Sequence, residues 1–251
     1  MRLKKSLSQV FLTNRSYLEK ISRAVDINGQ IVVEGGPGSG RMTEYFLNAK
    51  KLYCVELDER MCILLKEKFS HAANIEIIQA DILNFDFSAF KEKVVFYSNI
   101  PYSISKKIVE RLIGQRRNIS RAYILCQREF AAKIIAKTGD EAYGFLSCFT
   151  QYYAKPKKLL DVPRAVFSPK PNVDSTLVEL DFEPAKTLLP GNEKRFFEIL
   201  HRAFSYPRKQ IGAILAGIIP ADALNAAGID FKSRPAQISL GQYLYLANRT
   251  P

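Results

Sequence analysis

The chain has 251 residues, and its 37 Lys and Arg residues against 25 Asp and Glu give a formal charge of +12. A hydrophobic content of 47% with 25% charged residues is that of a folded globular protein and excludes a disordered, collagen-like or low-complexity chain. No stretch reaches the roughly 18 apolar residues of a membrane span. The basic N-terminus is not followed by the apolar run of a secretory signal, so we expect a cytoplasmic protein with no membrane partner.

Apolar runs of strand length alternate with amphipathic segments of helix length from residue 31 to about residue 130. This alternation predicts an α/β domain with a mostly parallel sheet. The expected strands are Ile31–Gly35, Lys51–Glu56, Ile75–Gln79, Val94–Ser98 and Ala122–Cys126. The expected helices are Tyr17–Val25, Met42–Asn48, Glu59–Phe69, Lys106–Ile113 and Glu129–Lys137. Two later runs, Leu146–Tyr153 and Ser175–Phe182, predict an antiparallel hairpin at the sheet edge.

The last part of the chain predicts a separate, small all-helical domain. Glu183–Gly191 has the composition of a linker. Helical patterns follow over Glu193–Phe204, Arg208–Ile218, Ala221–Ala227 and Ser239–Ala247. We therefore expect a catalytic domain over residues 1–182 and a linker with a small helical domain over residues 183–251. Positive charge is denser in this second part, which fits a surface facing RNA or DNA, and a solvated helical surface explains it nearly as well.

Cysteine and histidine give little support for a metal site. The four cysteines lie among apolar residues without metal-binding spacing, which indicates core positions in a reducing compartment. The two histidines, His71 and His201, are far apart in the sequence. We therefore expect neither a metal nor a catalytic triad.

A glycine-rich turn and two carboxylates follow three consecutive expected strands. The segment Glu34-Gly-Gly-Pro-Gly-Ser-Gly40 lets the backbone approach a ligand closely. Glu56 can accept from both ribose hydroxyls of an adenosine-containing ligand, and Asp81 can accept from an adenine amino group. These features predict a site for NAD or S-adenosylmethionine at the carboxyl ends of the strands. A structural turn and a capping aspartate are the alternatives.

The tetrapeptide Asn99-Ile-Pro-Tyr102 after the fourth strand indicates the chemistry. An exocyclic amine is a poor nucleophile because its lone pair is delocalised into the base. The Asn99 side-chain oxygen and the Ile100 carbonyl can accept the two amino hydrogens, while Pro101 fixes the direction of that carbonyl. Tyr102 offers a flat face on which a flipped base can stack. The pattern favours methyl transfer to a base; a proline turn capped by asparagine is the alternative.

These motifs resemble those of the ribosomal RNA adenine N6,N6-dimethyltransferases, which include the small-subunit dimethyladenosine transferases and the macrolide-resistance methyltransferases. The resemblance runs nearly end to end. It includes Ser8-Gln-Val-Phe-Leu12, Glu34-Gly-Gly-Pro-Gly38, Val55-Glu-Leu-Asp58, Ala80-Asp81, Asn99-Ile-Pro-Tyr-Ser-Ile-Ser105, Gln127-Arg-Glu-Phe130, Tyr143-Gly-Phe-Leu-Ser147 and Val162-Pro-Arg-Ala-Val-Phe-Ser-Pro-Lys-Pro-Asn-Val-Asp-Ser175.

The resemblance implies a Rossmann-like methyltransferase core that uses S-adenosylmethionine and transfers a methyl group directly to N6, twice, with no covalent intermediate. Catalysis then comes from positioning and from hydrogen bonds to the amine. Phe167 is expected to face Tyr102 across the target adenine, and Asn99 to border both cofactor and target. The implied catalytic residues are Asn99, Ile100, Pro101, Tyr102 and Phe167. The implied cofactor-binding residues are Gln9, Leu12, Glu34, Gly36, Gly38, Glu56, Asp81, Ile82 and Asn99.

Two positions depart from the family pattern. Val10 stands where the family usually has asparagine near the cofactor, and Gly35 stands where it usually has an apolar residue, which removes a packing group from the first strand. Neither departure touches the Asn99–Tyr102 segment. They leave open a catalytically idle RNA-binding assembly factor on the same fold. An NAD-dependent oxidoreductase explains the glycine turn but gives the Asn99–Tyr102 segment no role.

The C-terminal part resembles the small-subunit enzymes, for example in Phe196-Phe-Glu-Ile-Leu-His-Arg-Ala-Phe204. We therefore expect a monomer that dimethylates small-subunit ribosomal RNA in a precursor particle during ribosome assembly; large-subunit RNA is the alternative target. The expected phosphate contacts are Lys4, Lys5, Arg116, Arg117, Arg208 and Lys209.

Overall fold

The computed structural model describes residues 10–182 and 191–249. The chain divides into two compact units, Met1–Ala131 with Lys155–Phe182 and Ala132–Ala154 with Glu183–Pro251. This division differs from the expected domains because residues 132–154 belong to the second unit. The expected contacts Gln9, Lys4 and Lys5, and the linker before Gly191, lie outside the described residues.

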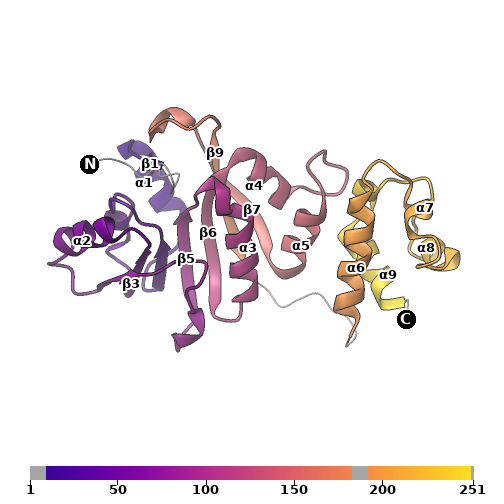
Figure 1. The fold of residues 1–251 in the computed structure, drawn as a ribbon, viewed down its shortest axis with the longest axis horizontal. Coiled ribbons are helices and arrows are strands. Elements are labelled where there is room, and N and C mark those ends of the chain that lie inside the picture. Colours follow the sequence, from indigo (N-terminus) through magenta and orange to yellow (C-terminus); the bar gives the residue numbers. More distant parts are fainter. Residues whose placement is uncertain (1–9, 183–190, 250–251) are drawn as a thin grey trace. The chain divides into compact units, whose positions relative to one another are not determined.

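Within the described residues, the first unit is built on a seven-stranded sheet in the order β4-β3-β2-β5-β6-β9-β7 (Figure 1). Neighbouring strands in the run β4-β3-β2-β5-β6 pair in parallel, whereas β9 pairs antiparallel with both β6 and β7. Their bounds are β2 Ile31–Gly35, β3 Lys51–Glu56, β4 Ile75–Gln79, β5 Val94–Asn99, β6 Ile119–Gln127, β7 Lys155–Val162 and β9 Ser175–Asp181. This arrangement confirms the expected α/β class.

The strand order reverses between β2 and β5, because β3 and β4 lie on one side of β2 and β6 lies beyond β5. A crevice forms outside the carboxyl ends of parallel strands at such a reversal. The glycine turn after β2 and the Asn99–Tyr102 segment at the end of β5 therefore reach the same place from adjacent strands.

Four of the five helices expected between residues 17 and 137 are present. The helices are α1 Arg15–Ala24, α2 Glu59–Lys68, α3 Ser105–Gly114 and α4 Arg128–Ile135. The segment Met42–Asn48 forms only a short 3₁₀ helix, η2 Thr43–Phe46, rather than the expected helix. The Thr43 hydroxyl donates a hydrogen bond to the buried Glu34 carboxylate at the start of this segment. The Ala49 amide donates to the Phe46 carbonyl at its end, so that only one helical turn fits between them.

The expected hairpin strand Leu146–Tyr153 is wrong, since this segment is the helix α5, Phe145–Tyr153. Phe149 packs its ring against both Phe145 and Tyr153 at 6.0 and 5.5 Å, which is the i, i+4 spacing of a helix. The true hairpin partner of β9 is β7. The lysines and Pro156 of β7 are not typical of a strand inside a sheet, but both are typical of a strand at the sheet edge, where β7 lies.

Two short strands close the N-terminal side of the first unit. β1 (Phe11–Leu12) pairs antiparallel with β8 (Phe167–Ser168), so that Leu12 lies opposite Phe167. The core beneath them contains buried side chains from α1, η2 and the sheet. Cys54, Cys62, Cys126 and Cys148 are buried and unbridged.

The second unit is helical over its described residues. Besides α5 it contains α6 Asn192–Ser205, α7 Ile211–Leu215, α8 Ala221–Ala226 and α9 Leu240–Arg249. The expected helix Arg208–Ile218 is shorter because Gln210 has an extended backbone, with φ −70° and ψ 140°. Tyr243 is buried between these helices and donates its hydroxyl to the Pro235 carbonyl at 2.9 Å. No helix in the described part is long and apolar enough to span a membrane.

Candidate active site

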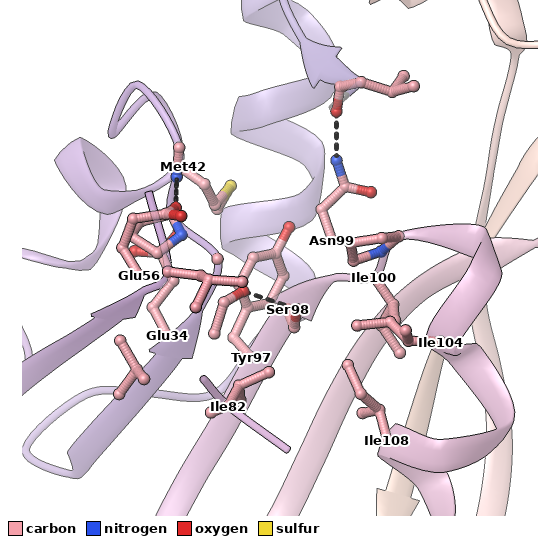
Figure 2. A pocket seen from close by; sticks show the side chains of 18 of the residues that line it. Glu34, Met42, Glu56, Ile82, Tyr97, Ser98, Asn99, Ile100, Ile104 and Ile108 are labelled. Carbon is pink, nitrogen blue, oxygen red and sulfur yellow. Dashed lines mark hydrogen bonds between the residues drawn. The ribbon is translucent and has the colours of Figure 1, made fainter. Parts of the chain in front are cut away.

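A cavity of about 280 Å³ lies at the carboxyl ends of β2 to β5 (Figure 2). It collects most of the site residues expected from the sequence, although they come from five separate segments. These are Leu12, Glu34, Gly36, Gly38, Glu56, Asp81, Ile82, Asn99, Ile100, Pro101 and Tyr102.

The glycine turn has a backbone that only glycine adopts easily. Gly36 and Gly38 have φ of +65° and +56°. A Cβ on Gly38 would lie 2.5 Å from Cε1 of Phe11, so the N-terminal segment packs directly on this turn. The amide of Gly36 donates to the Val55 carbonyl at 2.8 Å and ties the turn to β3.

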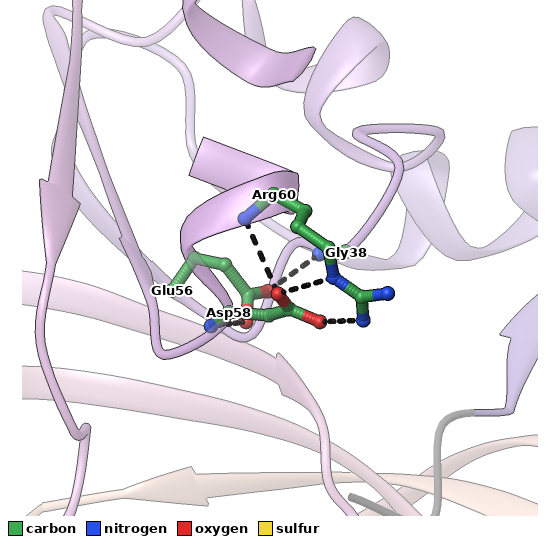
Figure 3. Close-up of polar contacts among 4 residues, drawn as sticks. All are labelled: Gly38, Glu56, Asp58 and Arg60. Carbon is green, nitrogen blue, oxygen red and sulfur yellow. Dashed lines mark hydrogen bonds and ion pairs between the residues drawn. The ribbon is translucent and has the colours of Figure 1, made fainter. Parts of the chain in front are cut away.

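The Glu56 carboxylate is held by two backbone amides (Figure 3). Oε2 accepts from the Gly38 amide at 3.0 Å and Oε1 from the Asp58 amide at 2.9 Å. Asp58 caps α2 and is paired with Arg60. Glu56 is thus oriented on the cavity wall, and a carboxylate oxygen can accept more than one hydrogen bond, which fits a pair of ribose hydroxyls.

Glu34 is the most deeply buried acid of the site, with 2% of its surface exposed. Thr43 donates its hydroxyl to Glu34 Oε2 at 2.7 Å. Burial raises the pKa of Glu34 to about 7, the Thr43 hydrogen bond opposes this shift, and nearby Glu56 adds to it. Thr43 is not predictable as a site residue from the sequence, because a hydroxyl within an amphipathic segment carries no distinct signal.

Asp81 both caps a turn and lines the cavity. Its Oδ1 accepts from the Leu83 amide at 2.9 Å, so the capping alternative is also realised. Ile82, Ile104 and Ile108 line the same cavity and give it apolar surface (Figure 2). A carboxylate next to apolar side chains fits an adenine ring with its amino group.

Gly35 removes a packing group from the first strand without leaving empty space there. A Cβ on Gly35 would lie 3.0 Å from Cγ1 of Ile82 and 3.1 Å from two ring carbons of Phe96. These side chains fill the volume that the family's apolar residue would occupy. The Gly35 carbonyl accepts a hydrogen bond from the Ser98 hydroxyl at 2.7 Å.

Asn99 is oriented by the N-terminal segment. Its Nδ2 donates to the Val10 carbonyl at 3.1 Å (Figure 2). Because the amino side of the amide is engaged in this way, the side-chain oxygen is left to accept from a ligand. The Pro101 carbonyl accepts from the Ile104 amide at 3.1 Å, whereas the Ile100 amide is bonded to Leu125 of β6. Tyr102 is half-buried, and its hydroxyl lies 3.3 Å from the Ser175 Oγ.

Phe167 does not join these residues. Its side chain is 5% exposed and packs in the hydrophobic cluster that includes Leu12 and Val162, outside the residues that line the cavity. Its expected place opposite Tyr102 is not seen in the described structure, and a role in stacking stays a prediction.

The described residues among the expected phosphate contacts belong to both units. Arg116 and Arg117 lie between α3 and β6, before β6 begins, so they are at the amino ends of the parallel strands and not at the site edge. Arg208 and Lys209 are exposed between α6 and α7 of the second unit, where the Lys209 ammonium lies 4.7 Å from the Tyr206 ring centroid.

The described residues contain no group of three or more His, Cys, Asp or Glu side chains that could hold a metal ion. The cavity's own groups fit S-adenosylmethionine: a glycine turn after β2, the oriented Glu56 carboxylate at the end of β3 and Asp81 after β4, with apolar side chains in the same lining. The parallel sheet, its switch point and this donor set define a Rossmann-like methyltransferase.

Comparison with known proteins gives the family. Residues 1–250 match the family described as ribosomal RNA adenine dimethylase. The chain belongs to this family, which confirms the expected enzyme class.

Its relatives include "Ribosomal RNA small subunit methyltransferase A" of Pelotomaculum thermopropionicum, 34% identical over 98% of this chain and 90% of the relative. The protein of the same name from Mycoplasma mobile is 32% identical over 97% and 96%. Among solved structures, the 23S rRNA methyltransferase ErmE has a TM-score of 0.81 and 28% identity, covering 96% of this chain and 99% of its own. A dimethyladenosine transferase from Plasmodium falciparum also has a TM-score of 0.81, with 26% identity over 94% and 95%.

Proposed function

We propose that this chain transfers methyl groups from S-adenosylmethionine to N6 of adjacent adenosines in small-subunit ribosomal RNA during ribosome assembly. The observation that carries the reaction is the hydrogen bond from Asn99 Nδ2 to the Val10 carbonyl. This bond fixes which end of the amide faces the cavity, and the oxygen is the end that an amino group needs.

When bound, S-adenosylmethionine supplies a methyl group on a sulfonium, which is a good leaving group. The chain's own residues then have to make the adenine amine reactive. Asn99 Oδ1 and the Ile100 carbonyl accept its two hydrogens and favour a lone pair directed out of the ring plane. The Tyr102 ring stacks on the base and offsets part of the cost of flipping it from the RNA. Positioning of this kind needs no covalent intermediate.

The relatives favour the small subunit as the source of the target. The two relatives described above carry the name "Ribosomal RNA small subunit methyltransferase A", and so do six further relatives of 30–37% identity. The fold does not separate the two targets, because ErmE and the dimethyladenosine transferase have the same TM-score. A large-subunit target is therefore the second candidate. The cytoplasmic location, the monomeric state and the phosphate contacts at Arg208 and Lys209 belong to the same proposal.

The test is transfer of labelled methyl groups from S-adenosylmethionine to undermethylated 30S particles and to naked 23S RNA. We expect label in the 30S particles, loss of it with Asn99→Ala, and retention with the matched control Asn118→Ala. Asn118 lies before β6, at the opposite ends of the parallel strands, so it is remote from the site. Label on 23S RNA alone would transfer the proposal to the large subunit. Absence of label on both RNAs, with S-adenosylmethionine still bound, would indicate an idle assembly factor.

A second pair of variants examines the stacking role. Tyr102→Phe keeps the ring and loses only the hydroxyl near Ser175, so we expect methylation close to that of the wild type. Tyr102→Ala removes the ring, and base stacking is worth about 1–3 kcal/mol, so we expect the rate to fall by roughly 5- to 150-fold. Equal rates for both variants would contradict the role of Tyr102.

A further inference from the structure

The cavity carries an uneven set of charges. Among the described residues that line it there are three carboxylates, Glu34, Glu56 and Asp81, and one cation, Arg41. Any anionic group of a ligand would be repelled by the carboxylates and would have Arg41 as its single cationic side chain in this lining. Arg41 follows directly after the glycine turn at the end of β2, whereas Asp81 follows β4, and β3 lies between these two strands.

Arg41 also differs from its basic neighbours in being unengaged. Lys68 donates to the Ser39 and Gly40 carbonyls at 3.1 and 3.2 Å and pairs with Glu44 at 2.6 Å. Arg60 pairs with Asp58. Arg41 is exposed, and within the described residues it has neither a hydrogen bond nor an ion pair. Its guanidinium is therefore available to a ligand.

Val10, the residue that stands in place of the family's asparagine, offers no substitute for this cation. Val10 lines the same cavity and has an apolar side chain, while its carbonyl is taken by Asn99. A ligand whose carboxylate lies near the glycine turn thus finds one guanidinium, since the amides of Gly36 and Gly38 already donate to Val55 and Glu56. Guanidinium groups bind carboxylates through two parallel N–H···O bonds, which makes arginine well suited to this task.

We propose that Arg41 binds the α-carboxylate of S-adenosylmethionine. This assignment rests on the proposed function, since it takes S-adenosylmethionine as the ligand. With Glu56 on the ribose and Asp81 beside the adenine, the amino-acid part of the ligand lies toward the glycine turn, where Arg41 provides the charge that the Val10 side chain does not.

The experiment compares two ligands and two variants by isothermal titration calorimetry. Decarboxylated S-adenosylmethionine keeps the adenosine, the sulfonium and the amino group and lacks only the carboxylate. We expect Arg41→Gln to weaken binding of S-adenosylmethionine by about tenfold and to leave the decarboxylated ligand unchanged, because only the former loses a charge-assisted bond. The matched control is Arg15→Gln. Arg15 lines a groove that adjoins the cavity and shares Arg41 with it, but Arg15 does not line the cavity itself and is paired with Glu19. Both affinities should therefore stay at wild-type values.

Each other result overturns the assignment. Equal losses for both ligands would mean that Arg41 acts on the site as a whole. Unchanged affinity for S-adenosylmethionine together with weaker RNA binding would assign Arg41 to phosphate, since it also borders the groove shared with Arg15. If the wild type itself binds no S-adenosylmethionine, the proposed function fails too; if it binds and Arg41→Gln equals it, only the Arg41 assignment fails.

Discussion

Glu34 offers a quantitative test of the site's electrostatics. Burial raises the pKa of this carboxyl from its ordinary value of 4.5 to about 7. Between these two pH values the folded protein holds a proton on Glu34 that the unfolded chain has released. The stabilisation from that proton is fully present below about pH 4.5 and is lost as the pH rises through about 7. At about 1.4 kcal/mol for each tenfold change in acidity, the total is about 3 kcal/mol.

Glu34→Gln keeps the shape of the side chain and an oxygen for the Thr43 hydroxyl, and it removes the charge. We therefore expect the free energy of unfolding of the variant, relative to wild type, to increase by about 2 to 3 kcal/mol between pH 5 and pH 8. The variant should be the more stable protein at pH 8 because it avoids a buried charge.

Urea unfolding at both pH values, followed by circular dichroism, measures this double difference. Other titrating groups cancel, since they are common to both proteins. Glu67→Gln is the control: Glu67 is exposed on α2, so the same change there should shift neither value measurably. A pH-independent difference between Glu34→Gln and wild type would refute the assignment of a neutral Glu34 below neutrality.

Three further outcomes follow from the geometry of the site. Affinity for cationic S-adenosylmethionine should rise between pH 6 and 8 in wild type, because ionised Glu34 favours a cation, and calorimetry of Glu34→Gln should show no such rise. Gly35→Ile should destabilise the fold by about 1–3 kcal/mol in urea unfolding, because the new side chain would contact Phe96. Adding Phe96→Val to this variant should recover part of the loss. An unchanged stability of Gly35→Ile would show that the strand has room for the side chain. Lys68→Met should weaken S-adenosylmethionine binding severalfold with little change in thermal stability, since it releases two carbonyls of the glycine turn; unaltered binding would mean that the turn holds its shape without the ammonium.

Sequence patterns located the parallel strands well because each is an apolar run between turn residues, and the three strands Ile31–Gly35, Lys51–Glu56 and Ile75–Gln79 have the expected bounds. The strand order then brought the glycine turn and Asn99 together, as expected from doubly wound sheets. The errors arose where composition and tertiary context disagree. The aromatic residues of Phe145–Tyr153 favour a strand by intrinsic preference, yet their i, i+4 ring contacts stabilise a helix.

The position of charge was harder to predict than its presence. Arg116 and Arg117 are basic in any context, but their distance from the site depends on the direction of β6. That strand has nine residues and so places its two ends roughly 26 Å apart at about 3.3 Å per residue. Arg41 carries no distinct signal in the sequence for a similar reason, since it stands out only as the one cation among three acids that the fold brings to the described lining of the cavity.

The hydrogen bond from Asn99 to Val10 depends on the backbone at position 10 and not on the side chain there. Val10 contributes its main-chain carbonyl, and every amino acid carries that same group. Replacement of a side chain at position 10 therefore leaves the orienting acceptor in place, whereas loss of the adjoining β1–β8 pairing would leave that carbonyl without a fixed position. Position 10 should accordingly tolerate changes of residue type far better than changes that disrupt β1.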